Sequence, residues 1–91
     1  MKITEIVWDD ETIEHIARHS VISSEVEEMF FGETHPFVEK GRENLYIVMG
    51  QTNTGRYIFT VVKLTGKGKA KIITAREMSD KDKKHYKRRM K

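Results

Sequence analysis

The chain has 91 residues, of which 37% are apolar and none is cysteine, so it makes one domain over residues 1–91 and excludes disulfides, thiol catalysis and cysteine zinc sites. No apolar run approaches the roughly 18–20 residues that span a bilayer, and Met1–Trp8 is too short and too charged for a signal peptide, so we expect a soluble, cytoplasmic protein. Residues 1–45 hold eleven Asp/Glu and four Lys/Arg, whereas residues 46–91 hold thirteen Lys/Arg and three Asp/Glu. This division predicts a basic surface, built by the C-terminal half, that meets a polyanion or an acidic partner.

The first third of the chain predicts a strand followed by two helices. Residues 2–8 alternate in polarity as a short strand does, and Asp9 or Asp10 is suited to cap a helix that ends near Ser20. The capping box Ser24-x-x-Glu27 predicts the start of a second helix, which stops at Gly32.

The remainder predicts strands and one last helix. Strands are expected at Phe37–Glu39, Leu45–Met49, Tyr57–Leu64 and Lys69–Ala75, and turn-like segments of hairpin length separate the last three. Those three strands should therefore form an antiparallel meander. The capping box Ser79-x-x-Asp82 then opens a basic helix. The order β-α-α-β-β-β-β-α predicts an α+β domain with an antiparallel sheet.

The C-terminal segment Lys81–Lys91 carries seven Lys/Arg. Mutual repulsion makes it a poor helix alone, and a ligand with several phosphates would stabilise it by neutralising those charges. Tyr86 in this segment either docks on the core or stacks on an exposed base. The alternative for the last residues is a solvated tail.

Arg56 and Arg76 stand at the ends of two predicted strands, next to turns. A planar guanidinium binds a phosphate through two hydrogen bonds and stabilises the extra charge of a phosphoryl transition state. If these strands pair through the turn at residues 65–68, the two arginines lie close together. The alternative is two ordinary surface arginines, one of them paired with Glu77 or Glu43.

Five further residues could take part in chemistry. His15 and His19 share a helix face, but no third ligand is evident and we expect no metal. Arg18 either orients a phosphate or complements the helix dipole. Glu43 and His35 could each transfer a proton, although we favour an exposed charge and a turn residue as their roles.

Five segments in order resemble the BrnT-like family, the toxins of type II toxin–antitoxin pairs: WDD, RHSV, MFF, YIVMGQTNTGRYIFTVV and IITAREMSDKDKKHY. The resemblance implies a RelE-like fold and an endoribonuclease that needs neither metal nor cofactor. It further implies a DNA-binding antitoxin that holds the toxin inactive, with an oligomer of the two as one arrangement.

The family pattern carries over by position to six residues: Trp8, Arg18, His19, Arg56, Arg76 and Tyr86. Arg18 and Ser20 replace the Lys and Gly of the family's K-H-G step, and Leu45 stands where the family often has arginine.

The expected reaction is attack of a ribose 2′-hydroxyl on the adjacent phosphate. Arg56 and Arg76 would stabilise the phosphorane charge and Arg18 would orient a phosphate, while the general base is left open among Glu43, His19 and a lysine. The residues expected to bind RNA are Trp8, Lys84, Tyr86, Lys87 and Arg88. Two non-catalytic alternatives use the same basic face, as a nucleic-acid-binding module or as an antitoxin-docking domain.

Overall fold

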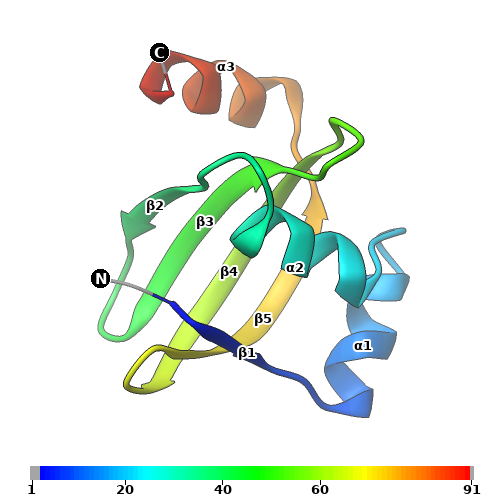
Figure 1. Cartoon of the computed structure of the whole chain (residues 1–91), viewed down its shortest axis with the longest axis vertical. Coiled ribbons are helices and arrows are strands. Elements are labelled where there is room, and N and C mark those ends of the chain that lie inside the picture. Colours follow the sequence, from blue (N-terminus) through cyan, green and yellow to red (C-terminus); the bar gives the residue numbers. More distant parts are fainter. Residues whose placement is uncertain (1–2, 91) are drawn as a thin grey trace.

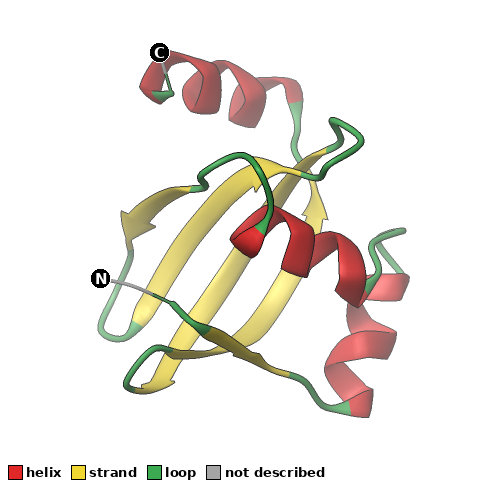
Figure 2. Cartoon of the chain, viewed as in Figure 1, coloured by secondary structure: helices red, strands yellow, loops and turns green. Residues whose placement is uncertain are grey.

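The computed structural model describes residues 3–90, which form five strands and three helices (Figures 1 and 2). In chain order these are β1 (Glu5–Val7), α1 (Asp10–Ala17), α2 (Ser23–Phe31), β2 (Phe37–Lys40), β3 (Leu45–Gln51), β4 (Tyr57–Gly66), β5 (Lys69–Glu77) and α3 (Asp80–Arg89). The α+β class and the order of elements are as the sequence predicts. Within residues 3–90, no helix is long and apolar enough to cross a membrane.

The strands form one sheet in the order β1-β5-β4-β3-β2. Strands β2 to β5 pair antiparallel with their neighbours in the chain, but β1 pairs parallel to β5, with Ile6 opposite Ala70. The predicted antiparallel sheet is present in β2 to β5, but the parallel pairing of β1 was not predicted and makes the sheet mixed. The polarity of residues 2–8 identifies a strand but carries no information about its partner, which the helical connection through α1 and α2 determines.

The first helix is shorter than predicted and the second is longer. Asp9 caps α1 by accepting a hydrogen bond from Thr12 N–H at 2.7 Å, and α1 ends before Ser20, which adopts a left-handed φ of 63°. In α2 the Glu25 carboxylate accepts a hydrogen bond from Ile22 N–H at 3.1 Å, so the helix starts two residues earlier than the Ser24-x-x-Glu27 box predicts. Gly32 ends α2 as expected.

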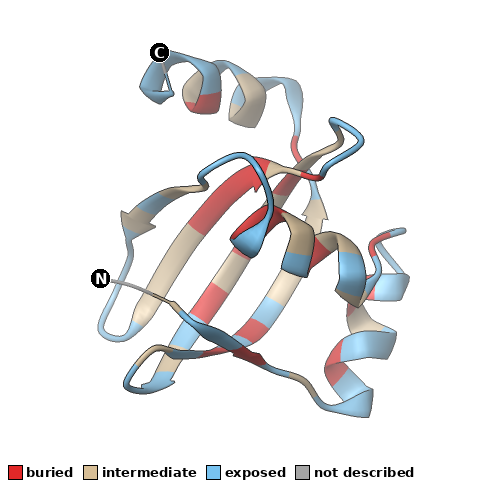
Figure 3. Cartoon of the chain, in the orientation of Figure 1, coloured by how far each residue is buried: buried red, intermediate tan, exposed pale blue. Residues whose placement is uncertain are grey.

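Side chains of the strands alternate between two apolar clusters on opposite faces of the sheet. Figure 3 shows buried positions along β3, β4 and β5. The larger cluster lies under α1 and α2, where Val48 is fully buried. Gly50 permits this packing, because a Cβ there would stand 2.8 Å from Met29 Cγ. The smaller cluster lies under α3 and contains Met49, Met78 and Tyr86.

The last helix crosses one end of the sheet, beyond the ends of β3 and β5 (Figure 1). Its predicted capping box is confirmed, since Ser79 Oγ accepts a hydrogen bond from Asp82 N–H at 3.1 Å and Asp82 accepts one from Ser79 N–H at 3.0 Å. Tyr86, only 3% exposed, anchors the helix to the sheet.

Candidate active site

Two arginines lie at the same end of the central strands. Strand register pairs Gln51 with Tyr57 and Ile58 with Glu77, which places the turn between β3 and β4 beside the end of β5. Arg56 immediately precedes β4, and Arg76 is the penultimate residue of β5. The geometry of the hairpins therefore brings both residues to one edge of the fold.

Arg56 is held by carboxylates from two elements. Its Nη1 donates to both carboxylate oxygens of Glu25 at 2.8 Å, and its Nε donates to Glu77 at 3.1 Å. The hydrogen bond to Glu25 raises the pKa of Arg56 above its usual value and the bond to Glu77 adds to this, against a smaller opposing effect of desolvation. Nη2 bonds to no residue within 3–90, so the guanidinium is oriented with one edge available.

Arg76 is fixed on the other face of the sheet. Its Nη1 donates to Asp82 of α3 at 2.8 Å and to the Glu77 carbonyl at 3.0 Å. The guanidinium carbon lies 4.1 Å from the centre of the Phe59 ring, the residue opposite Arg76 in the register. This cation–π contact and the ion pair together hold the side chain against the sheet.

Arg56 and Arg76 both donate hydrogen bonds to Glu77, so they lie near each other as predicted. The alternative pairing of Arg56 with Glu77 is also present. Three carboxylates, of Glu25, Glu77 and Asp82, face the two arginines, so the cluster is not a bare cationic site. Most of the positive charge nearby comes instead from α3.

The exposed face of α3 carries the basic residues predicted to bind RNA. Lys84, Lys87 and Arg88 are exposed, and Lys87 Nζ lies 5.3 Å from the centre of the Tyr57 ring. Tyr86, by contrast, is buried, and its ring meets that of Tyr57 edge to face with centroids 6.0 Å apart. Burial raises the pKa of the Tyr86 hydroxyl above its usual value. Docking of this residue on the core is confirmed, whereas its part in binding RNA stays a prediction.

A second polar site lies between α1 and β5. A groove of about 320 Å³ is lined by residues that include His15, Arg18 and Lys71. His15 Nε2 is 3.1 Å from Thr74 Oγ1, and its ring centre is 5.4 Å from that of His19. Arg18 and His19 lie at the end of α1, beside this groove, and both are exposed.

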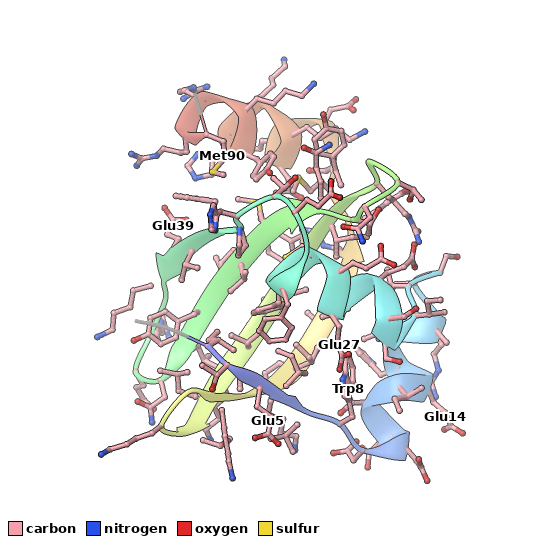
Figure 4. All side chains as sticks on the ribbon, viewed as in Figure 1. Glu5, Trp8, Glu14, Glu27, Glu39 and Met90 are labelled. Carbon is pink, nitrogen blue, oxygen red and sulfur yellow. The ribbon has the colours of Figure 1, made fainter. Side chains whose placement is uncertain are left out.

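Two predicted site residues lie apart from the arginines. Glu43, in a left-handed conformation with φ of 51°, precedes β3 at the end opposite Gln51. The length of β3 separates these ends by about 20 Å. Trp8 packs against the larger cluster and its Nε1–H donates to Glu27 at 2.9 Å, beneath α2 in Figure 4. Glu43 is therefore not placed to contact a phosphate bound at Arg56.

No group of three histidine, aspartate or glutamate side chains among residues 3–90 is arranged to hold a metal ion. The spacing of His15 and His19 raised that question. Their rings contact each other, and His15 also contacts Thr74.

The ion pair of Asp82 makes the attachment of α3 sensitive to acid. Desolvation raises the pKa of Asp82, but hydrogen bonds from Ser79 and Arg76 outweigh it and hold this pKa below its usual value. A depressed pKa in the folded state contributes stability above the unfolded-state value, which is lost as the pH falls through the folded-state value. We expect Asp82→Asn to lower the melting temperature at pH 7 and to lower it less below about pH 4.

Melting curves followed by circular dichroism from pH 7 to pH 2 measure this difference. Asp80→Asn is the matched control, since Asp80 is exposed on the same helical turn and makes no ion pair among the described residues. If acidification lowers the melting temperatures of Asp82→Asn and wild type equally, the assignment is contradicted.

With this geometry established, comparison with known proteins gives a family. Residues 8–82 match the sequence model of the ribonuclease toxin BrnT of type II toxin–antitoxin systems. The chain belongs to the BrnT family. The matched range includes α1, both arginines and the start of α3.

The structure is also similar to the 1.1 Å crystal structure of the ribonuclease toxin BrnT of Brucella abortus. The TM-score is 0.65 at 20% sequence identity, over 84% of this chain and 97% of that one. Likeness at this identity establishes the BrnT fold for the chain. Comparison with curated protein sequences gives no match.

Three residues of the site were missed from the sequence: Glu25, His15 and Thr74. Glu25 holds Arg56 from the first turn of α2, and only the true start of that helix would have indicated it. The sequence suggests a metal ligand, an exposed residue or a cap as the role of His15, whereas its contact with Thr74 joins residues 59 positions apart. No local pattern reports such a contact.

Proposed function

We propose that the protein is an endoribonuclease toxin that cleaves RNA without a metal ion or other cofactor. The ribose 2′-hydroxyl attacks the adjacent phosphate, giving a 2′,3′-cyclic phosphate and a free 5′-hydroxyl. The observation that carries the proposal is the pair of arginines fixed at one end of the sheet, beside the basic helix α3, in a chain of a ribonuclease toxin family.

Arg56 and Arg76 stabilise the charge that develops on the phosphorane. Their orientation is set before substrate arrives, by Glu25 and Glu77 in one case and by Asp82 and Phe59 in the other. Preorganised donors are effective because they need no rearrangement during the reaction. Arg18 orients a neighbouring phosphate from the end of α1.

Affinity comes from the exposed cations of α3. Lys84, Lys87 and Arg88 neutralise backbone phosphates on either side of the scissile bond, so binding falls steeply as salt rises. Trp8 lies beneath α2, away from α3, and we assign it no phosphate contact, since its ring packs on the core and its N–H is bonded to Glu27 (Figure 4).

The partner is an antitoxin protein that binds DNA and covers the basic face, and the fold is of the RelE-like kind. The family model supports this part of the proposal, because it describes a type II toxin–antitoxin system. An acidic segment would match the net positive charge of residues 46–91.

Incubation of purified protein with a defined RNA in excess EDTA tests the function. We expect cleavage to persist and the 5′ fragment to end in a 2′,3′-cyclic phosphate. RNA that stays intact while bound in a salt-dependent manner would instead establish the non-catalytic binding module. Fragments with 3′-hydroxyl ends would contradict the 2′-hydroxyl mechanism.

A further inference from the structure

The groove between α1 and β5 holds a histidine that the arginine-based mechanism does not use. We propose that His15 is the general base of the reaction, accepting the proton of the attacking 2′-hydroxyl. This inference rests on the proposed ribonuclease function and names the group that function still lacks.

The orientation of His15 suits proton transfer. Its ring is half-buried, with Nε2 3.1 Å from Thr74 Oγ1, while Nδ1 bonds to no residue within 3–90. When Nε2–H donates to Thr74, Nδ1 is the unprotonated nitrogen and faces no competing partner. A base held by a third group in this way is the general arrangement for activating a hydroxyl nucleophile.

The position of Thr74 connects the groove to the arginines. Thr74 and Arg76 are two residues apart on β5, opposite Val61 and Phe59, so their side chains emerge on the same face. Two residues of a strand span about 7 Å. His15 Nε2 lies a further 3.1 Å from Thr74 Oγ1, so a nucleotide whose phosphate meets Arg76 and whose ribose extends along β5 would have its 2′-hydroxyl on the side of His15.

Charges around His15 favour a bound phosphate on one side. Arg18 and Lys71 line the groove with it, and His19 lies against its ring. Glu11 and Glu14 line the same groove from α1. The groove therefore carries both signs of charge, and Lys71 Nζ lies 3.9 Å from Asp9 Oδ2.

The proposed step balances without a further reagent. The O–H bond of the 2′-hydroxyl breaks as its oxygen bonds to phosphorus, and the proton passes to Nδ1 of His15. The bond from phosphorus to the 5′-oxygen breaks, and that oxygen takes a proton from water. His15 returns its proton to solvent before the next turnover.

Single-turnover cleavage by wild type and His15→Gln measures the role of this residue. We expect kcat to fall by about 10²–10⁴-fold with little change in KM, the range for loss of a general base. Thr74→Val, which removes only the hydroxyl, should lower kcat by a smaller factor. His35→Gln, an exposed histidine in the loop before β2, is the control and should cleave as wild type does.

A substrate with sulfur in place of the bridging 5′-oxygen separates base from acid. Thiolate leaves without a proton, so a missing general acid is compensated and a missing general base is not. The defect of His15→Gln should therefore persist with this substrate. Rescue by the sulfur, an unchanged kcat, or a loss confined to KM would each overturn the inference while leaving the ribonuclease function intact. A wild type that does not cleave RNA overturns both.

Discussion

Replacement of both Arg56 and Arg76 by alanine is expected to abolish RNA cleavage and relieve growth arrest on induced expression. Each single substitution should lower kcat by about 10²–10³-fold, the usual effect of removing one preorganised donor to a developing negative charge. The double substitution should fall to the level of the uncatalysed reaction, because both guanidiniums act on the same phosphorane. Gel analysis of cellular RNA and cleavage of a defined RNA in vitro provide the measurement.

The fold should survive these changes, which makes the result interpretable. Both ion pairs are partly exposed, and such pairs contribute at most about 1 kcal/mol each. Arg42→Ala removes an exposed arginine at the opposite end of β3 and controls for lost charge. If the double variant is unfolded by circular dichroism, or cleaves as the Arg42 variant does, the catalytic assignment fails.

Truncation of Tyr86 to alanine should detach α3 and remove RNA affinity with it. Tyr86 is the buried residue of this helix, and loss of a buried aromatic side chain typically lowers the free energy of unfolding by about 3–5 kcal/mol. Since α3 carries Lys84, Lys87 and Arg88, its release disperses the cations that bind phosphate. We expect a lower midpoint of urea unfolding together with weaker, less salt-dependent RNA binding.

Tyr86→Phe keeps the ring and serves as the control. The Tyr86 hydroxyl has no hydrogen bond to any described residue, so its removal should leave both stability and RNA binding near wild type. A phenylalanine variant that loses RNA binding while remaining folded would show that the hydroxyl itself contacts RNA.

Local patterns predicted most of the fold. The caps at Asp9 and Ser79, the stop at Gly32 and the strands around the two hairpins all depend on residues close in sequence, and the structure has them. The start of α2 differs from the predicted one because two glutamates, Glu25 and Glu27, could each have accepted the hydrogen bond at the start of the helix. Glu25 bonds to the backbone, while Glu27 bonds to Trp8. The parallel pairing of β1 depends on residues far apart and was not predictable from alternation.

The candidate site followed from sequence only in part. Strand ends located Arg56 and Arg76, since hairpin register follows from turn length. The carboxylates that hold them come from α2 and α3, which pack on opposite faces of the sheet, and tertiary packing alone determines these contacts. Tyr86 could be read as core or as a stacking residue until its burial was known.

The parallel pairing of β1 with β5 also bears on the order of folding. Thr4 bonds to Gly68, 64 positions away, so the sheet is complete only when the segment made first meets one of the last. The hairpins of β3, β4 and β5 need only short loops and can form early, whereas closing this long loop carries a larger entropic cost. During synthesis on a ribosome, the part of the core around Ile6 therefore stays open until Ala70 has been made and the two strands have paired. Until β5 has been made, a nascent chain of this protein consequently lacks the sheet edge that supports α1. The groove of His15 is incomplete for the same reason.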